Sequence, residues 1–254
     1  MAVSIVAVVG LTAACSGSGS GSDGKDSGSG GGGAKPSVSA RGKLEKAALV
    51  PGDVRKYKVE KESAGSGNKA TPPTGRANPA ECRPLSEMLA AVAPPKSNAH
   101  VSRTLNGNDL ANTTTTEVVL LAYGRADAAK TMDALRAATK SRKCVTFGDG
   151  GHRYFGIRPQ PAPVGGDEAV SYKLASRAGE FLDRNRVSVV RSGSTVIAFR
   201  ASNLFDPESA KADKEGEAAG LPEKFRDRET ADPKVADAIV DAQLAKLGRL
   251  AEAK

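Results

Sequence analysis

Residues 186–201 read RVSVVRSGSTVIAFRA, and this stretch decides the class of the fold. Two β-branched, mainly apolar runs, Arg186–Arg191 and Thr195–Ala201, flank the triplet Ser192-Gly193-Ser194. A short Gly-containing turn between two such runs is typical of a β-hairpin, so the runs are expected to pair as antiparallel strands.

Alternation and apolar periodicity predict further elements on both sides of this hairpin. Strands are expected at 54–61, 113–123, 144–147, 153–157 and 168–175, and helices at 44–49, 84–93 and 126–141. Asp232 as a cap and Pro233 in the first turn predict the start of a C-terminal helix, whereas 205–228 is polar and is expected to be a loop with at most one helical turn. The order of elements predicts an α+β fold, with a mostly antiparallel sheet and helices packed on one of its faces.

The N-terminus indicates where the protein is placed in the cell. Residues 2–14 are apolar and uncharged, two alanines precede Cys15, and a Ser/Gly-rich tract follows. This pattern is typical of a bacterial lipoprotein: residues 1–14 would be a signal peptide, and Cys15 would carry acyl chains such as palmitate. Residues 15–42 would be a flexible, disordered tether to a single domain at 43–250. Because Thr12 stands where a lipobox has Leu, a signal peptide without lipidation or an N-terminal helix is the alternative.

The two remaining cysteines, Cys82 and Cys144, are expected to form a disulfide, since thiols oxidise outside the cytoplasm. A metal site is not expected, because the chain has no Cys-x-x-Cys and its two histidines, His100 and His152, lack the spacing of ligands. No cofactor motif is present in the sequence.

The formal net charge of +8 favours anionic partners. At a membrane surface these are anionic lipids, phosphate-bearing wall polymers or a small molecule. Nucleic acid is not expected, because the charges are dispersed and no aromatic stacking platform accompanies them. Four arginines lie on the final hairpin, Arg184, Arg186, Arg191 and Arg200, and those that share a face could bind an anionic group. Arg186, Arg191 and Arg200, together with His152, are the weak candidates for a ligand site. Solvated surface charge and protection of a sheet edge are the alternatives.

One segment, Gly148-Asp149-Gly150-Gly151-His152, suggests catalysis, with Asp149 orienting His152 as a general base for a serine nucleophile. No serine lies in a Gly-x-Ser-x-Gly elbow, however, and a glycine turn between two strands explains the same residues. The sequence therefore favours a protein that is not an enzyme.

Several short motifs are similar to those of a known family. They are Ala48-Leu49-Val50-Pro51-Gly52-Asp53-Val54, Tyr57-Lys58-Val59, the passage from Pro79 to Pro84 around Cys82, and Gly166-Asp167-Glu168-Ala169. Together with the signal cysteine and the tether, they resemble actinobacterial surface lipoproteins related to the PknH-like extracellular sensor domains, over residues 44–250. The resemblance implies an extracytoplasmic α+β domain with a central antiparallel sheet, disulfide support and a cleft for a ligand. This chain differs from that family in having only one available disulfide and no kinase domain.

These observations predict a lipid-anchored protein on the extracellular face of the cell membrane that acts as a non-enzymatic ligand-binding or sensor-like module of the cell envelope. The alternatives are an envelope hydrolase that uses His152 and Asp149, and a scaffold for a protein partner.

Overall fold

The structure is a computed structural model that describes residues 39–61, 74, 76–89, 96–108, 114–220 and 232–252. Cys15, the signal peptide and most of the expected tether lie outside these residues. The helices are α1 (Ala40–Ala47), α2 (Arg83–Glu87), α3 (Arg125–Lys140), α4 (Pro207–Ala218) and α5 (Asp237–Glu252), with 3-10 turns at Ala80–Cys82 and Arg142–Cys144. The strands are β1 (Tyr57–Lys61), β2 (Ala99–Gly107), β3 (Thr115–Ala122), β4 (Thr146–Asp149), β5 (His152–Gln160), β6 (Glu168–Ala178), β7 (Phe181–Ser192) and β8 (Thr195–Phe205).

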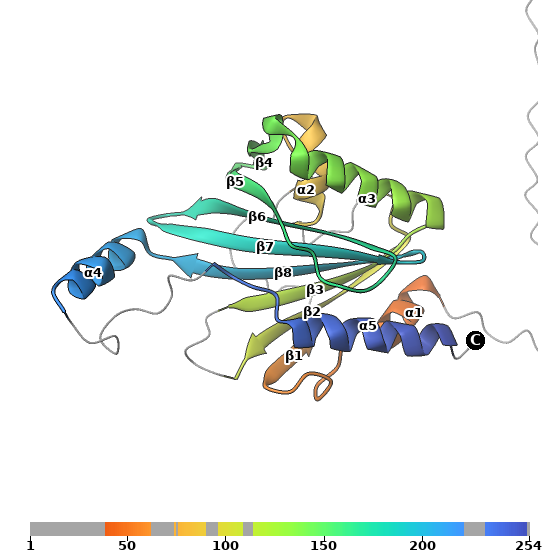
Figure 1. The fold of residues 1–254 in the computed structure, drawn as a ribbon. Coiled ribbons are helices and arrows are strands. Elements are labelled where there is room, and N and C mark those ends of the chain that lie inside the picture. The colour runs from red at the N-terminus through yellow and green to blue at the C-terminus, as the bar shows by residue number, and fades with distance from the viewer. Residues whose placement is uncertain are drawn as a thin grey trace, which may run out of the picture. The chain divides into compact units, whose positions relative to one another are not determined.

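The eight strands form one sheet in the order β1-β2-β3-β8-β7-β6-β5-β4, and every neighbouring pair is antiparallel (Figure 1). The expected hairpin is confirmed: β7 and β8 pair from Ser192 opposite Thr195 to Leu182 opposite Phe205. This hairpin lies in the centre of the sheet and carries its longest strands.

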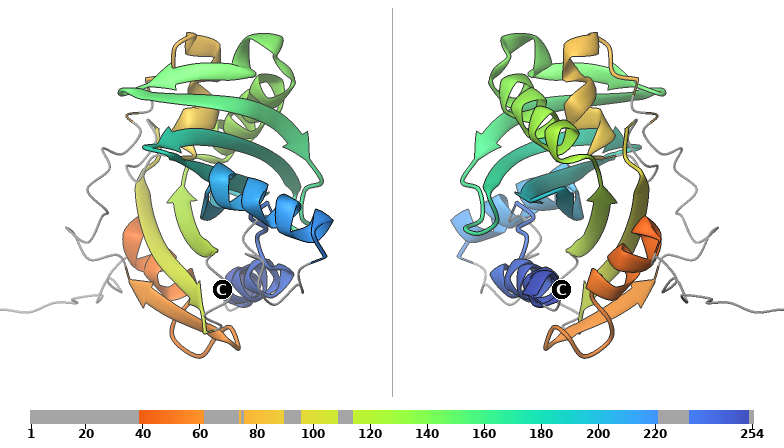
Figure 2. Two further views of the ribbon diagram at one scale, coloured as in Figure 1. Left: turned by 90° about the vertical axis from the view of Figure 1, so that its left-hand side faces the viewer. Right: turned by 90° about the vertical axis from the view of Figure 1, so that its right-hand side faces the viewer.

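Helices cover both faces of the sheet. This follows from β8, where residues 196–199 are all buried although their side chains point alternately to opposite faces. Val196 and Ala198 pack in the cluster that includes α2 and α3, whereas Ile197 and Phe199 pack with α1 and α5. Figure 2 shows these two helix pairs on either side of the sheet. The α+β class and the antiparallel sheet are thus confirmed, and the single helix-covered face that we expected is replaced by two.

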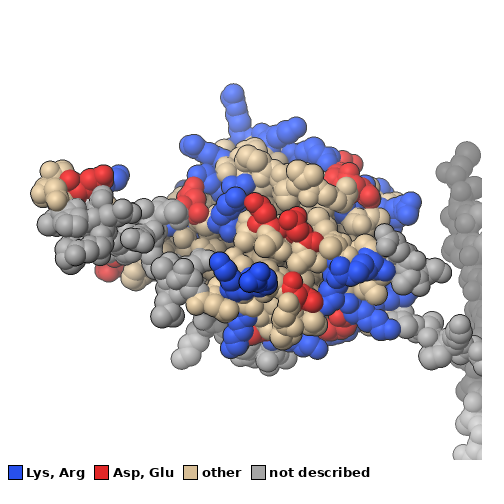
Figure 3. All heavy atoms as spheres, turned by 60° about the horizontal axis from the view of Figure 1, so that its bottom comes forward, with Lys and Arg blue, Asp and Glu red and all other residues tan. Residues whose placement is uncertain are grey.

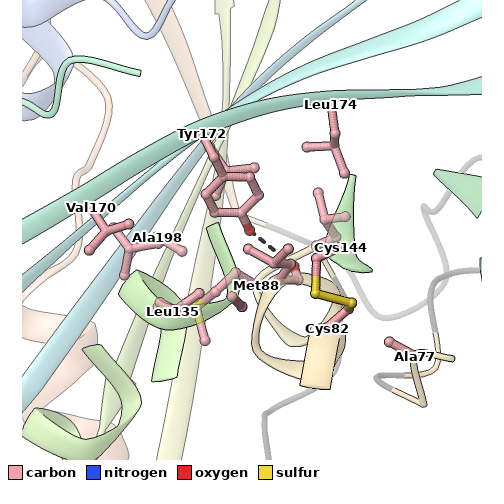
Figure 4. Packing of buried hydrophobic residues seen from close by; sticks show 14 of the residues in the cluster. Ala77, Cys82, Met88, Leu135, Cys144, Val170, Tyr172, Leu174 and Ala198 are labelled. Carbon is pink, nitrogen blue, oxygen red and sulfur yellow. Dashed lines mark hydrogen bonds between the residues drawn. A yellow bond between two sulfur atoms is a disulfide. The ribbon is translucent and has the colours of Figure 1, made fainter. Parts of the chain in front are cut away.

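The core on the α3 side is fixed by Tyr172 and by the disulfide (Figure 4). The fully buried Tyr172 points from β6 toward α2, and its hydroxyl donates a hydrogen bond of 3.0 Å to the carbonyl oxygen of Leu85. The expected bridge between Cys82 and Cys144 is present, and it joins the entry of α2 to the chain that leaves α3.

The main differences from the sequence expectation concern four elements. The polar segment after β8 contains the twelve-residue helix α4, where Asp206 caps the backbone N–H of Glu208. Strand β2 was not predicted at all. Helix α1 starts at Ala40, within the expected tether, and α5 starts at Asp237, five residues after the expected cap Asp232. Apolar periodicity missed α4 because this helix has no apolar face to bury.

The disulfide closes a loop of 62 residues, and replacing Cys82 and Cys144 together by Ser should lower the free energy of unfolding by about 4 kcal/mol through the entropy of the unfolded chain. Urea unfolding of the oxidised protein and of the double variant measures this difference. A thiol reagent that labels Cys82 and Cys144 in the denatured, unreduced protein would contradict the bridge.

Candidate functional site

A cavity of about 250 Å³ lies on the face of the sheet that α5 partly covers. The face follows from strand periodicity: Val190 of β7 packs in the same cluster as Ile239 of α5, and Arg186, four residues earlier, points to the same side. Four cations and one acid contribute to the lining, namely Arg158, Lys173, Arg184, Arg186 and Asp232. We call this cavity the basic pocket.

Like charges face one another across three strands of this pocket. Arg158 of β5 lies opposite Lys173 of β6, which lies opposite Arg186 of β7. Like charges directly opposite in a sheet are destabilising. On their own these like-charge pairs therefore oppose folding, and they need compensation from an oppositely charged group.

A bulge in β5 brings Arg158 into the row. Phe155 pairs with Ala175 and Arg158 with Lys173, so the two residues between them on β5 face a single residue on β6. Gly156 of the bulge has a φ of 69°, a conformation that favours glycine. The extra residue buries Ile157 on the α3 side and leaves Phe155 and Arg158 both lining the pocket.

Asp232 is the acidic partner of these cations. Its Oδ2 lies 2.7 Å from the Nζ of Lys173, and its Oδ1 lies 3.8 Å from the Nη1 of Arg184. The hydrogen bond from Lys173 is the main reason why the pKa of Asp232 lies below its usual range, although partial burial opposes it.

Arg186 is held by uncharged groups. Its Nη1 donates to the Oε1 of Gln160 and its Nη2 to the carbonyl oxygen of Pro161, both at 2.9 Å. Burial lowers the pKa of Arg186, and the attraction of Asp232 only partly offsets this effect. The Arg186 guanidinium is thus half-buried in the same row as two further cations, Lys173 and Arg158.

The other two candidate arginines are neutralised on the α3 side. Arg191 binds Glu168 through Nε at 2.5 Å and Asp167 through Nη1 at 2.7 Å. Arg200 pairs with Glu117 at 2.6 Å and donates to the carbonyl oxygen of Leu89. Of the predicted arginines on the hairpin, Arg184 and Arg186 belong to the basic pocket, and Arg191 and Arg200 stabilise the fold.

A second hollow of about 540 Å³ adjoins the first and shares Phe155 with it. His152, Arg153 and Arg177 contribute to its lining. Arg177 lies four residues after Lys173 on β6, so its side chain points to the same face. His152 therefore lies at a basic surface.

Figure 3, with the bottom of Figure 1 brought forward, shows Lys and Arg scattered among Asp and Glu. The diffuse surface charge expected as an alternative is thus visible. The basic pocket differs from this diffuse charge because three of its cations lie directly opposite one another on neighbouring strands.

Asp149 has a structural role. Its buried carboxylate accepts hydrogen bonds from the backbone N–H groups of Thr74 and Arg76 and from the hydroxyls of Thr74 and Ser86. Burial alone would raise the pKa of Asp149, but the hydrogen bonds from Ser86 and Thr74 outweigh it and hold the pKa below its usual range. Ser86 donates directly to the carboxylate, whereas a serine hydrolase places an imidazole between its serine and its acid.

Two features are absent from the described residues. These residues contain no group of three or more His, Cys, Asp or Glu side chains placed to hold a metal ion. Nor does any helix in this part of the chain combine the length and the apolar character needed to cross a membrane.

Comparison with solved structures gives a weak structural neighbour. No family model and no curated protein matches the chain. An uncharacterized protein from the actinobacterium Mycobacterium smegmatis is similar over 78% of this chain and 89% of its own, at 12% sequence identity and a TM-score of 0.37.

Replacing Asp149 by Asn should lower the free energy of unfolding at pH 7 by about 2 kcal/mol, because it weakens hydrogen bonds to buried donors. The pKa of Asp149 is depressed in the folded state, so its contribution is present above the unfolded pKa of about 4 and is lost as the pH falls through the folded value. The difference between wild type and variant should therefore shrink below about pH 4.

Urea unfolding from pH 7 to pH 3 checks this expectation. Asp133→Asn, at a side chain that is 73% exposed, is the matched control and should be nearly neutral. A difference for Asp149→Asn that stays constant over this range would contradict the role given to the carboxylate.

Proposed function

We propose that this chain is a non-enzymatic binding module of the bacterial cell envelope, and that the basic pocket holds an anionic group of its ligand. In this proposal a lipid on Cys15 anchors the protein to the extracellular face of the membrane, and the Ser/Gly-rich tract links the anchor to the folded domain. The sequence resemblance to actinobacterial lipoproteins with PknH-like sensor domains belongs to the same proposal.

The observation that carries the proposal is the row of Arg158, Lys173 and Arg186 along a cavity. Elsewhere on the hairpin, Arg191 and Arg200 each have a carboxylate within 2.7 Å, whereas Arg186 donates to neutral oxygens. An external anion would complete the charge compensation that Asp232 supplies only in part. Guanidinium groups suit this role, since they bind oxyanions with two parallel hydrogen bonds.

A binding role is favoured over hydrolysis by the position of Asp149. Its carboxylate is buried and bound to Ser86 and to the backbone at Thr74 and Arg76. Asp149, the residue that would orient the general base in a hydrolase, is thus engaged in contacts that stabilise the fold. His152 lines the second hollow beside Arg153, where it adds to the polar surface available to a ligand.

Replacing Arg186 by Gln tests the pocket. The affinity of the full chain for inorganic pyrophosphate, measured by isothermal titration calorimetry, should fall about tenfold, as expected for the loss of one charge-assisted hydrogen bond. The free energy of unfolding should change little, because the repulsion from Lys173 is relieved when the bonds of Arg186 are lost.

Lys58→Gln is the matched control, because it removes the same charge at a side chain that is 71% exposed and pairs with Glu60 on β1. Its affinity for pyrophosphate should equal that of the wild type. Equal losses in both variants would mean that net charge, and not the pocket, governs binding.

The anchor requires a separate test. In the actinobacterial membrane fraction, the wild type should incorporate a radiolabelled or alkyne-tagged palmitate, and Cys15→Ala should not. When cells are fractionated, the wild type should be found with the membranes and Cys15→Ala in the soluble fraction, since acyl chains supply the attachment. Acylation of the Cys15→Ala variant, or a wild type without acyl chains, would overturn this part of the proposal.

A further inference from the structure

The segment before α5 places an acid in the basic pocket instead of extending the helix. Asp232 and Pro233 have the pattern of a helix start, yet α5 begins at Asp237. The segment is held by the buried Val235, while Asp232 and Pro233 line the pocket. The backbone at Asp232 is therefore held beside the pocket, and its exposed carboxylate reaches Lys173.

We propose that the Asp232 carboxylate occupies the place of a phosphate group of the ligand, and that such a ligand displaces it from Lys173 and Arg184. This inference rests on the proposed function, and it names the chemical class of the anion.

The contacts of Asp232 are those of an incomplete substitute. One carboxylate oxygen lies 2.7 Å from Lys173, but the other is 3.8 Å from Arg184, beyond hydrogen-bond distance. The carboxylate brings one negative charge to a lining with four cations. A phosphate group brings a charge of about −1.5 to −2 and three acceptor oxygens, so it can bind Lys173, Arg184 and Arg186 together.

Displacement is also feasible energetically. The side chains of Lys173 and Asp232 are 38% and 57% exposed, and ion pairs this exposed contribute little to stability. An incoming phosphate therefore loses little by breaking the pair. The cavity of about 250 Å³ leaves room for the group beside the arginines.

Asp232→Asn is the variant that tests the inference. It removes the internal competitor, so the affinity of the full chain for inorganic pyrophosphate should rise about fivefold, the equivalent of one exposed ion pair. Asp237→Asn is the matched control: it changes the net charge equally, five residues away, at a side chain that is 82% exposed and pairs with Lys234. Its affinity should stay within about twofold of the wild type, as expected for a screened charge.

The outcomes separate this inference from the proposed function. If the wild type binds pyrophosphate through Arg186 but Asp232→Asn and Asp237→Asn behave alike, the pocket binds anions and the role of Asp232 is wrong. If neither the wild type nor Asp232→Asn binds pyrophosphate, the proposed function fails as well.

A vesicle experiment separates the two sources of the phosphate, a lipid head group and a soluble or polymeric ligand. Sedimentation with vesicles of phosphatidylglycerol and phosphatidylcholine, compared with phosphatidylcholine alone, is measured for the wild type, Asp232→Asn and Asp237→Asn. A gain specific to Asp232→Asn and to phosphatidylglycerol, reversed by pyrophosphate, supports a lipid head group. Tighter pyrophosphate binding without that gain supports a soluble or polymeric phosphate.

Discussion

Burial of the β7–β8 hairpin on both of its sides is the constraint on which the rest of the structure depends. Residues 187–190 of β7 and 196–199 of β8 are buried without interruption. Because neighbouring side chains point to opposite faces, such strands are stable only between two layers. Helices α2 and α3 form one layer and α1 and α5 the other, each with its own apolar cluster.

The candidate site lies where that coverage ends. On the α5 side, Val190 is buried in the core, whereas Arg186 of the same strand lines a cavity. The bulge at Gly156 turns Arg158 toward the same cavity, and the register of β6 places Lys173 between the two arginines. The chain that leads into α5 supplies the acid that partly compensates them. Helix α5 thus helps to cover the core, and Asp232, in the segment before α5, offsets part of the positive charge of the pocket.

The sequence was most informative where a local rule applies. The turn Ser192-Gly193-Ser194 and its flanking runs predict the central hairpin. The expectation that the chain is exported, applied to its two remaining cysteines, predicts their bridge. Period-two alternation along β7 also separates Arg186 from Arg191. Strand β2 was missed because its pattern is broken by polar residues such as Arg103, which is buried through its ion pair with Glu45 and its bond to the carbonyl oxygen of Leu49.

The basic pocket itself depends on contacts between distant segments. The opposition of Lys173 and Arg186 follows from the register of β6 on β7, and Arg158 joins them only because of an irregularity in β5. Asp232 fits the pattern of a helix cap, and its pairing with Lys173, 59 residues away, decides otherwise. Local sequence patterns cannot predict these pairings, because they join segments that are far apart in the sequence.

The most direct test of the account is a titration of the isotope-labelled full chain with inorganic pyrophosphate, followed by nuclear magnetic resonance of backbone amides and arginine side chains. The account predicts that the largest shifts fall on Arg158, Lys173 and Arg186, while Arg191 and Arg200, in their carboxylate pairs, remain unchanged. Shifts centred on Arg191 or Arg200, or spread evenly over the exposed lysines, would contradict it.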